Sequence, residues 1–228
     1  MKTNYLTIYQ EAEVEFVEKK SRFIGYANPI QSDEEGAAFI EKIRSMHKQA
    51  THVVPVYVYG DNYECQRYSD DGEPSGTAGI PILSMLKQRN IKNIAIAVVR
   101  YFGGTKLGTG GLVRAYTHSA QLAIEEALLI EQVQMDGYHF SIDYTKYGKL
   151  QNELETRPYE IVSQDFMDRV SVEVATRTEN REALYAYLLN FTQGKEVLDA
   201  LRPRFVACKE GKVAGEDFLI SEDWVESR

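Results

Sequence analysis

Two stretches of the 228-residue chain combine residue types that could do chemistry. The first, VVRYFGGTKLGTGGLVRAY at residues 98–116, lies between an apolar run and the expected start of a helix. A strand, a glycine-rich loop and a helix form the arrangement in which free backbone N–H groups at a helix N-terminus bind an anion. The glycines of this predicted anion site are Gly103, Gly104, Gly108, Gly110 and Gly111.

Polar side chains complete the predicted anion site. Those with positive charge are Arg100, Lys106 and Arg114. Thr109 is the expected N-cap of the helix, and Gly110 and Gly111 would let a ligand approach the first turn closely. The loop is neither a Walker A motif, because Gly108 is followed by Thr109 rather than by Lys, nor a GxGxxG motif. A purely architectural loop, whose glycines serve tight turns and helix packing, is the alternative.

The distribution of charge along the chain favours an anion site. The net charge is −8, which argues against a generally basic nucleic-acid-binding surface. No Asp or Glu lies between Pro74 and Ile124, and this stretch of 51 residues holds 6 basic side chains. The glycine-rich loop therefore lies inside a positively charged stretch of an acidic protein.

The second stretch, RYSDDGEPSGTAGIP at residues 67–81, is acidic. Asp70, Asp71 and Glu73 could hold a divalent cation or act as paired carboxylates in acid–base catalysis. The alternative, which we favour, is an Asp-Gly turn whose carboxylates are neutralised by arginines. The expected arginines are Arg67, Arg100 and Arg114.

Neither the histidines nor the cysteines indicate a cofactor or a metal centre. His47 and His52 are five residues apart across an expected helix end, the wrong spacing for two ligands on one helix face. His118, on the helix after the loop, is expected nearest to the site, and a packing role is favoured for each histidine. Cys65 and Cys208 are far apart in the sequence and are expected to be reduced thiols. We expect no metal and no cofactor.

The composition is that of an ordinary globular protein, with 43% hydrophobic and 26% charged residues. No apolar run approaches the length that spans a bilayer, and the N-terminal residues lack the apolar region of a signal peptide. We therefore expect a cytoplasmic protein that does not contact a membrane.

Periodicity predicts an α+β chain with two domains. In the first half, strands are expected at residues 21–30, 52–60 and 93–102, and helices at 33–50, 79–90 and 112–129. Pro55 indicates an edge position for its strand. In the second half, the expected order is strand, helix, strand, strand, helix, strand over residues 138–144, 145–157, 159–166, 169–176, 180–191 and 196–207. This is the split βαβ pattern.

The motifs SDDGEPSGTAGIPIL and VVRYFGGTKLGTGGLVRAY closely resemble those of the IMPACT family, called the YigZ family in bacteria. KKSRFIGYANPI and HKQATHVVPVYVYG are similar to the two upstream blocks of that family, so the resemblance covers about Lys19 to Ala120. It implies an N-terminal domain of the ribosomal-protein-like βα fold found in elongation factors, followed by a ferredoxin-like domain similar to those of elongation factor G. We predict these domains over residues 1–135 and 136–207, with a tail over 208–228.

The resemblance also implies a role linked to translation. Eukaryotic members of the family regulate translation by binding a large activator of a kinase that phosphorylates an initiation factor. Those relatives carry an RWD domain that this sequence does not show, so we do not expect that partner here.

Three functions stay open at this stage. The expected one is a cytoplasmic protein that binds RNA, the ribosome or a translation factor through the anion site, which would also suit a small phosphate ligand. The second is an enzyme acting on a phosphorylated or peptide substrate, with the acidic turn facing the basic residues. The third is a protein-interaction module in which the motif is only structural.

Overall fold

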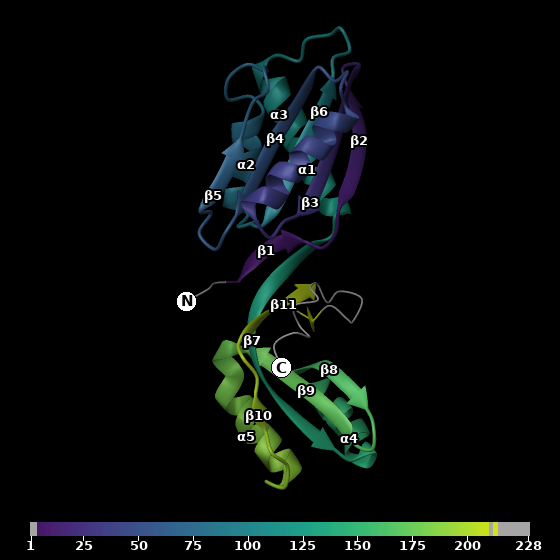
Figure 1. Cartoon of the computed structure of the whole chain (residues 1–228), viewed down its shortest axis with the longest axis vertical. Coiled ribbons are helices and arrows are strands. Elements are labelled where there is room, and N and C mark those ends of the chain that lie inside the picture. Colours follow the sequence, from purple (N-terminus) through teal and green to yellow (C-terminus); the bar gives the residue numbers. More distant parts are fainter. Residues whose placement is uncertain (1–3, 210–211, 214–228) are drawn as a thin grey trace. The chain divides into compact units, whose positions relative to one another are not determined.

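The computed structural model describes residues 4–209 and 212–213. The chain divides into two compact units, one of Tyr5–Glu131 and one that joins Asn4 to the residues from Gln132 onward. Both units mix strands with helices, which confirms the predicted α+β class (Figure 1). Within the described residues, none of the helices is both long and apolar enough to cross a membrane.

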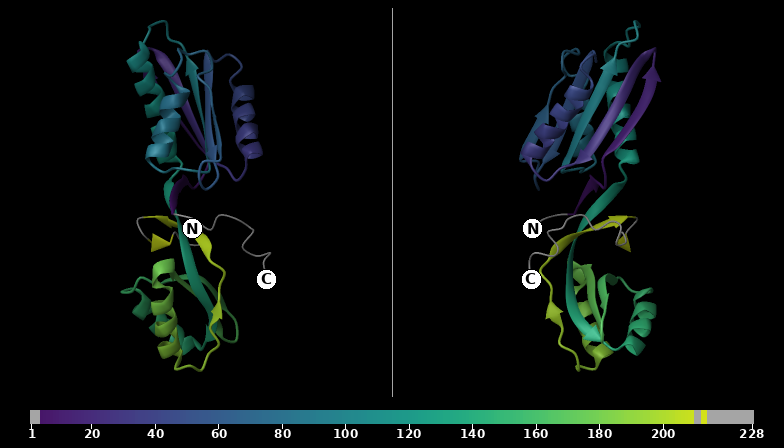
Figure 2. Two further views of the ribbon diagram at one scale, coloured as in Figure 1. Left: turned by 90° about the vertical axis from the view of Figure 1, so that its left-hand side faces the viewer. Right: turned by 45° about the vertical axis from the view of Figure 1, so that its right-hand side comes forward.

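The first unit contains a five-stranded antiparallel sheet with helices on both faces. Its strand order is β2-β3-β6-β4-β5. Helices α2 and α3 cover one face, and α1 covers the other (Figure 2). The elements are β1 (Tyr5–Ile8), β2 (Ala12–Glu18), β3 (Ser21–Pro29), α1 (Asp33–Met46), β4 (His52–Tyr59), β5 (Cys65–Tyr68), α2 (Gly79–Gln88), β6 (Ile94–Tyr101) and α3 (Thr109–Glu126).

Strand β6 is the central strand of this sheet, and every residue of it except Tyr101 is buried. Successive side chains point to opposite faces of a strand. The residues that face α2 and α3 are Ile94, Ile96 and Val98, and those that face α1 are Ala95, Ala97 and Val99. Arg100 continues the first of these rows, so the fold places a charged side chain at the end of an apolar row.

Several details of the first unit differ from the sequence-based expectation, and the helix expected over residues 112–129 runs from Thr109 to Glu126. The helix expected over residues 33–50 ends at Met46, because His47 leaves the helical conformation with φ −115° and ψ 48°. The sequence analysis predicted neither β1, β2 nor β5.

The prediction that Pro55 marks an edge strand is wrong, because β4 lies between β6 and β5. Pro55 pairs with Ala97 of β6, and its carbonyl oxygen accepts a hydrogen bond from the Ser69 backbone N–H. In an antiparallel strand the N and the O of one residue point to the same side. The missing N–H of Pro55 therefore faces the point where β5 has ended, and no hydrogen bond to β6 is lost.

The second unit follows the predicted order of strands and helices. Its fourth strand, β10, pairs with its first, β7, and the sheet continues through β9 to β8, the arrangement of a ferredoxin-like domain. Strands β11 and β12 extend this sheet on the side of β7 away from β9. The elements are β7 (Leu129–Ile142), α4 (Tyr144–Leu154), β8 (Glu160–Phe166), β9 (Val170–Arg177), η1 (Thr178–Asn180), α5 (Arg181–Thr192), β10 (Asp199–Ala200), β11 (Arg204–Lys209) and β12 (Lys212–Val213).

The strand expected over residues 196–207 is split into β10 and β11. Pro203, between the two, has no N–H to donate to a ladder. Strand β11 ends at Lys209 and pairs with β12, so the tail predicted from residue 208 begins inside a strand. Residues 210–211 and 214–228 of that tail lie outside the described residues.

The predicted domain boundary at residues 135–136 falls inside β7, which runs without a break from Leu129 to Ile142. The two apolar clusters on the faces of the first sheet nevertheless use no described residue beyond Leu129. A chain shortened to end at Met135 should therefore keep that core and unfold in a single cooperative transition, measured by circular dichroism in urea. A chain of this length that shows no cooperative transition would mean that the two units need each other to fold.

Candidate functional site

A buried ion pair lies at the base of the glycine-rich loop. The side chains of Arg100 and Glu73 are 5% and 4% exposed, and Arg100 Nη1 lies 2.5 Å from Glu73 Oε1. The hydroxyl of Tyr116, from α3, donates to the same carboxylate oxygen at 2.8 Å, and Arg100 Nη2 donates to Ser21 Oγ at 3.2 Å. These bonds join β6, the acidic turn, α3 and β3 at one point.

The ion pair is costly to break, because each charge has been removed from water. Burial and the nearby negative charge of Glu73 raise the pKa of Tyr116 above its ordinary value. Tyr116 therefore remains a protonated donor at neutral pH. Arg100, which the sequence analysis assigned to the anion site, instead neutralises Glu73.

His52, at the start of β4, pairs across the sheet with Arg100. Its Nδ1 lies 2.6 Å from the backbone carbonyl oxygen of Asp71. Because a carbonyl can only accept, this ring nitrogen carries the proton. The other nitrogen, Nε2, lies 3.7 Å from Glu73 Oε1, so the ring is held in one orientation beside the ion pair.

Asp70 supports the start of α2. Its carboxylate accepts backbone hydrogen bonds from Gly76 at 2.7 Å, Ala78 at 3.1 Å and Gly79 at 2.8 Å. Burial alone would raise the pKa of the Asp70 carboxyl, but these three backbone donors outweigh it and the pKa is lowered. The carboxylate does what a helix N-cap does, since the N-cap residue Ala78 has no side-chain cap of its own.

Asp71 is also engaged by the fold. One carboxylate oxygen accepts the backbone N–H of Val53 at 2.7 Å, and the other lies 3.2 Å from Arg44 Nη2. The residue has φ 47°, a left-handed conformation. No three His, Cys, Asp or Glu side chains in the described part of the chain are placed to hold a metal ion.

The arginines expected beside the acidic turn were assigned correctly in one case. Arg100 pairs with Glu73. Arg67 pairs with Asp33 instead, and Arg114 lies on α3 in a different pocket. Arg44, which neutralises Asp71, is far from the turn in sequence and was not predicted.

Gly103 is required by the backbone packing of the loop. A Cβ atom there would lie 1.9 Å from the backbone oxygen of Lys20, at the tip of the β2–β3 hairpin. The Gly103 N–H also donates to Ser21 Oγ at 3.2 Å. Gly104 and Gly108 have φ 83° and 76°, conformations that favour glycine. The backbone conformation and packing of the loop therefore explain why glycine occupies these three of the five loop positions.

The prediction that Thr109 caps α3 is wrong. The N-cap is Gly108, and Thr109 is the first residue of the helix. The first helical hydrogen bond runs from the Leu112 N–H to the Gly108 carbonyl oxygen at 2.9 Å. No described side chain caps the helix and none in its first turn is acidic, so the N–H groups before Leu112 remain open to an anion.

Gly110 differs from the other loop glycines. A Cβ atom at Gly111 would lie 3.0 Å from Leu107 Cβ, whereas one at Gly110 would have no described atom within 4 Å. Gly110 also lacks a positive φ. The fold gives no packing or backbone reason for glycine at this position.

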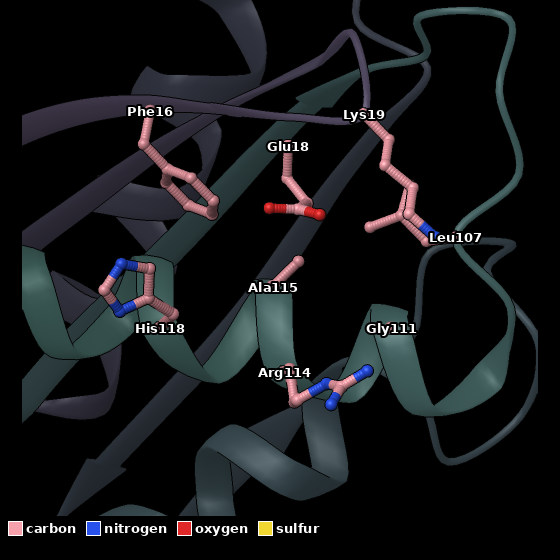
Figure 3. Close-up of a pocket in the computed structure, with 8 residues that line it drawn as sticks. All are labelled: Phe16, Glu18, Lys19, Leu107, Gly111, Arg114, Ala115 and His118. Carbon is pink, nitrogen blue, oxygen red and sulfur yellow. The ribbon is translucent and has the colours of Figure 1, made fainter.

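Two pockets flank the loop and the start of α3. Six of the nine residues predicted for the anion site line one or the other, whereas Gly103, Gly104 and Gly110 line neither. The larger, of about 430 Å³, is lined by Thr51, His52, Glu73, Pro74, Arg100, Phe102, Lys106, Leu107, Gly108, Thr109 and Leu112. The smaller, of about 320 Å³, is lined by Phe16, Glu18, Lys19, Leu107, Gly111, Arg114, Ala115 and His118 (Figure 3). Leu107 contributes to both.

Lys19 and Lys20, at the tip of the β2–β3 hairpin, bring charge that the sequence analysis did not assign to the site. Both are exposed and have left-handed backbone conformations, with φ 46° and 66°, which are uncommon for residues other than Gly, Asn and Asp. Lys19 extends toward Leu107, and Arg114 lies beside Gly111 across the same pocket (Figure 3). The hairpin tip and the glycine-rich loop lie at the same end of the first unit (Figure 1).

The exposed cations that line the two pockets at the start of α3 are Lys19, Lys106 and Arg114, which we call the basic rim. Two other cations of the acid-free stretch have hydrogen-bond partners elsewhere. Lys92 is buried and donates to the Asp61 carbonyl oxygen, and Lys87 donates to Gln66. The basic rim therefore comes from two segments of the chain, and only one of them lies in the acid-free stretch.

Substitution of two loop glycines should separate structural from functional roles. Gly103→Ala forces a backbone clash and should lower the free energy of unfolding by more than about 2 kcal/mol. Gly110→Ala meets open space in a helix and should leave stability unchanged or raise it by up to about 1 kcal/mol. Urea unfolding of both variants measures this, and equal losses of stability would contradict the assignment.

Asp70→Asn should destabilise the chain by about 1–2 kcal/mol at pH 7, because three backbone donors lose a charged acceptor. The pKa of the Asp70 carboxyl is lower in the folded chain than in the unfolded chain, where it is near 4. The carboxylate therefore stabilises the fold above about pH 4, and this stabilisation is lost as the pH falls through the pKa of the folded chain. The difference between parent and variant should therefore shrink between pH 7 and pH 3 in urea unfolding. A difference that is constant with pH would show that the carboxylate charge is not what holds the turn.

Comparison with known proteins places the chain in a family. The Impact N-terminal domain matches residues 19–124, and a domain of unknown function, DUF1949, matches residues 140–195. IMPACT family member YvyE of Bacillus subtilis is 38% identical over 192 residues, which are 84% of this chain and 88% of that protein. IMPACT family member YigZ of Escherichia coli is 34% identical over 185 residues, 80% of this chain and 91% of that one.

A solved structure agrees with the two-unit architecture. A crystal structure described as that of a hypothetical protein matches with a TM-score of 0.54 and 30% identity, over 89% of this chain and 99% of that chain. The match to the Impact N-terminal domain includes the glycine-rich loop, and the match to DUF1949 includes α4, β8, β9 and α5. The chain belongs to the IMPACT family.

Proposed function

We propose that this chain is a cytoplasmic regulatory protein linked to translation, and that its first unit binds the phosphate backbone of RNA at the start of α3. Membership of the IMPACT family supports the link to translation, since the eukaryotic members that the sequence resembles regulate translation. RNA, whether free or in the ribosome, presents the regular row of phosphates that a cluster of exposed lysines and arginines binds.

One observation carries this proposal: the basic rim surrounds a helix N-terminus that has no described side-chain cap. Backbone N–H groups and exposed cations are the groups that bind phosphate oxygens in protein–nucleic acid complexes. Gly110 leaves the first turn bare where the fold itself needs no glycine. This favours a binding role over a motif that is only structural.

The acidic turn supports the fold in this proposal rather than catalysis. The carboxylate of Asp70 accepts three backbone N–H groups, that of Asp71 contacts Val53 and Arg44, and that of Glu73 is bonded to Arg100 and Tyr116. Groups with these bonds are poorly placed to transfer protons to a substrate.

Removing three cations of the basic rim tests the proposal. The variant with Lys19→Ala, Lys106→Ala and Arg114→Ala should bind a single-stranded RNA of about 20 nucleotides at least tenfold more weakly at 50 mM salt. The slope of log affinity against log salt should fall by about 2, because each phosphate contact contributes about 0.7 for a single strand. Arg100 is left unchanged because its loss would disturb the buried ion pair.

A matched control carries Lys48→Ala, Lys149→Ala and Lys195→Ala. These lysines are exposed and line neither pocket, and the change in net charge is the same. The control should keep the affinity and the salt dependence of the parent. Equal weakening in both variants would show that only net charge matters, and lack of RNA binding by the parent would reject the proposed function.

A further inference from the structure

Phe102 is an exposed aromatic ring in the wall of the larger pocket. It is 46% exposed, although it directly follows the buried central strand β6. Its backbone N–H donates to Thr51 Oγ1 at 2.9 Å. Arg100 Cζ lies over the ring, 5.4 Å from its centroid, so the guanidinium covers one face of the ring and holds it in place.

Arg100 can hold the ring of Phe102 in place because the Arg100 side chain is itself fixed by other contacts. Its Cζ also lies over the ring of Phe23 at 5.4 Å, and Glu73 and Ser21 hold its terminal nitrogens. The Nε of this side chain, which is 5% exposed, has no hydrogen-bond partner among the described residues. Buried donors without an acceptor are rare, and this one lies in the side chain that lines the pocket behind Phe102.

The rest of the pocket suits a flat, largely apolar group with an anion attached. Pro74, Leu107 and Leu112 give apolar walls, and Lys106 and Thr109 lie where α3 begins. A volume of about 430 Å³ falls in the range of pockets that take small ligands. An inorganic anion would need the cations but not the aromatic ring.

We propose that an unpaired nucleobase stacks on Phe102 in this pocket while its phosphate binds Lys106 and the first turn of α3. Aromatic rings at the edge of a positively charged surface are the stacking platforms of proteins that bind single-stranded nucleic acids. A duplex keeps its bases stacked on each other, so the site takes single strands. This inference rests on the proposed function and names the part of the RNA that the site reads.

The test compares three probes of similar length: single-stranded oligoadenylate, an abasic oligomer with the same backbone, and the same oligoadenylate paired in a duplex. The parent should bind the single strand about 5- to 100-fold more tightly than either of the others, the range expected for stacking of one base. Phe102→Leu should remove that preference while leaving the affinity for the abasic oligomer unchanged. Tyr68→Leu, at another ring of the first unit that is 49% exposed, is the matched control and should keep the preference.

Phe102→Trp supplies a signal that a merely structural ring would not give. The sequence has one Trp, so the fluorescence added by the new indole can be measured against the parent. Oligoadenylate should quench it and the abasic oligomer should not. This variant should also restore the preference for the single strand that Phe102→Leu loses.

The outcomes separate this inference from the proposed function. Equal, salt-dependent binding of oligoadenylate and the abasic oligomer by the parent would overturn base stacking and leave phosphate binding intact. Equal affinity of the parent for the duplex and the single strand would also overturn base stacking and leave phosphate binding intact. A parent that binds none of the probes would overturn both proposals together.

Discussion

The buried ion pair between Arg100 and Glu73 is the interaction on which the functional end of the first unit depends. Strand β6 places a cation at the end of an otherwise apolar row, and such a charge is tolerated inside a protein only when it is paired and hydrogen-bonded. Glu73 meets this requirement from the acidic turn, and Tyr116 and Ser21 complete it from α3 and β3. The turn, the hairpin and the helix are thereby held around one guanidinium.

This constraint decides which charges are available to a ligand. Because Arg100 is neutralised by Glu73, it contributes shape and rigidity rather than free charge. The cations of the basic rim form no ion pair with a described residue, and they line the pockets at a helix start whose N–H groups have no side-chain cap among the described residues. Gly103, packed on the backbone of Lys20, keeps the hairpin tip against the loop, so the two segments that carry the basic rim lie side by side.

Much of the fold could be predicted from sequence because local patterns carry it. The apolar run of β6, the helix after the glycine-rich loop and the βαββαβ order of the second unit all follow from periodicity and turn residues. The prediction for Pro55 failed because a missing N–H removes one hydrogen bond on one side of the strand. A strand inside a sheet tolerates this where its neighbour on that side has already ended, so a proline does not require an edge strand. Thr109 was misplaced as an N-cap because the left-handed Gly108 already starts the helix.

The site was harder to predict because its partners are distant in sequence. Arg44 and Asp71 are brought together only by the fold, and so are Lys20 and Gly103. The charge count over residues 74–124 includes Arg100 and Lys92, and both side chains are buried. The same count missed Lys19, which lies in a motif that was seen but not given a role.

We propose that RNA phosphates bind the bare first turn of α3, while the ion pair between Arg100 and Glu73 only holds the fold. Titration of the whole protein with single-stranded RNA, followed by the backbone amide signals in NMR, tests this most directly. The amide signals of Thr109, Gly110 and Gly111 should show the largest changes in chemical shift. The proposal is contradicted if the RNA binds and the largest changes in amide chemical shift lie in the second unit, while the amide signals at the start of α3 stay unchanged.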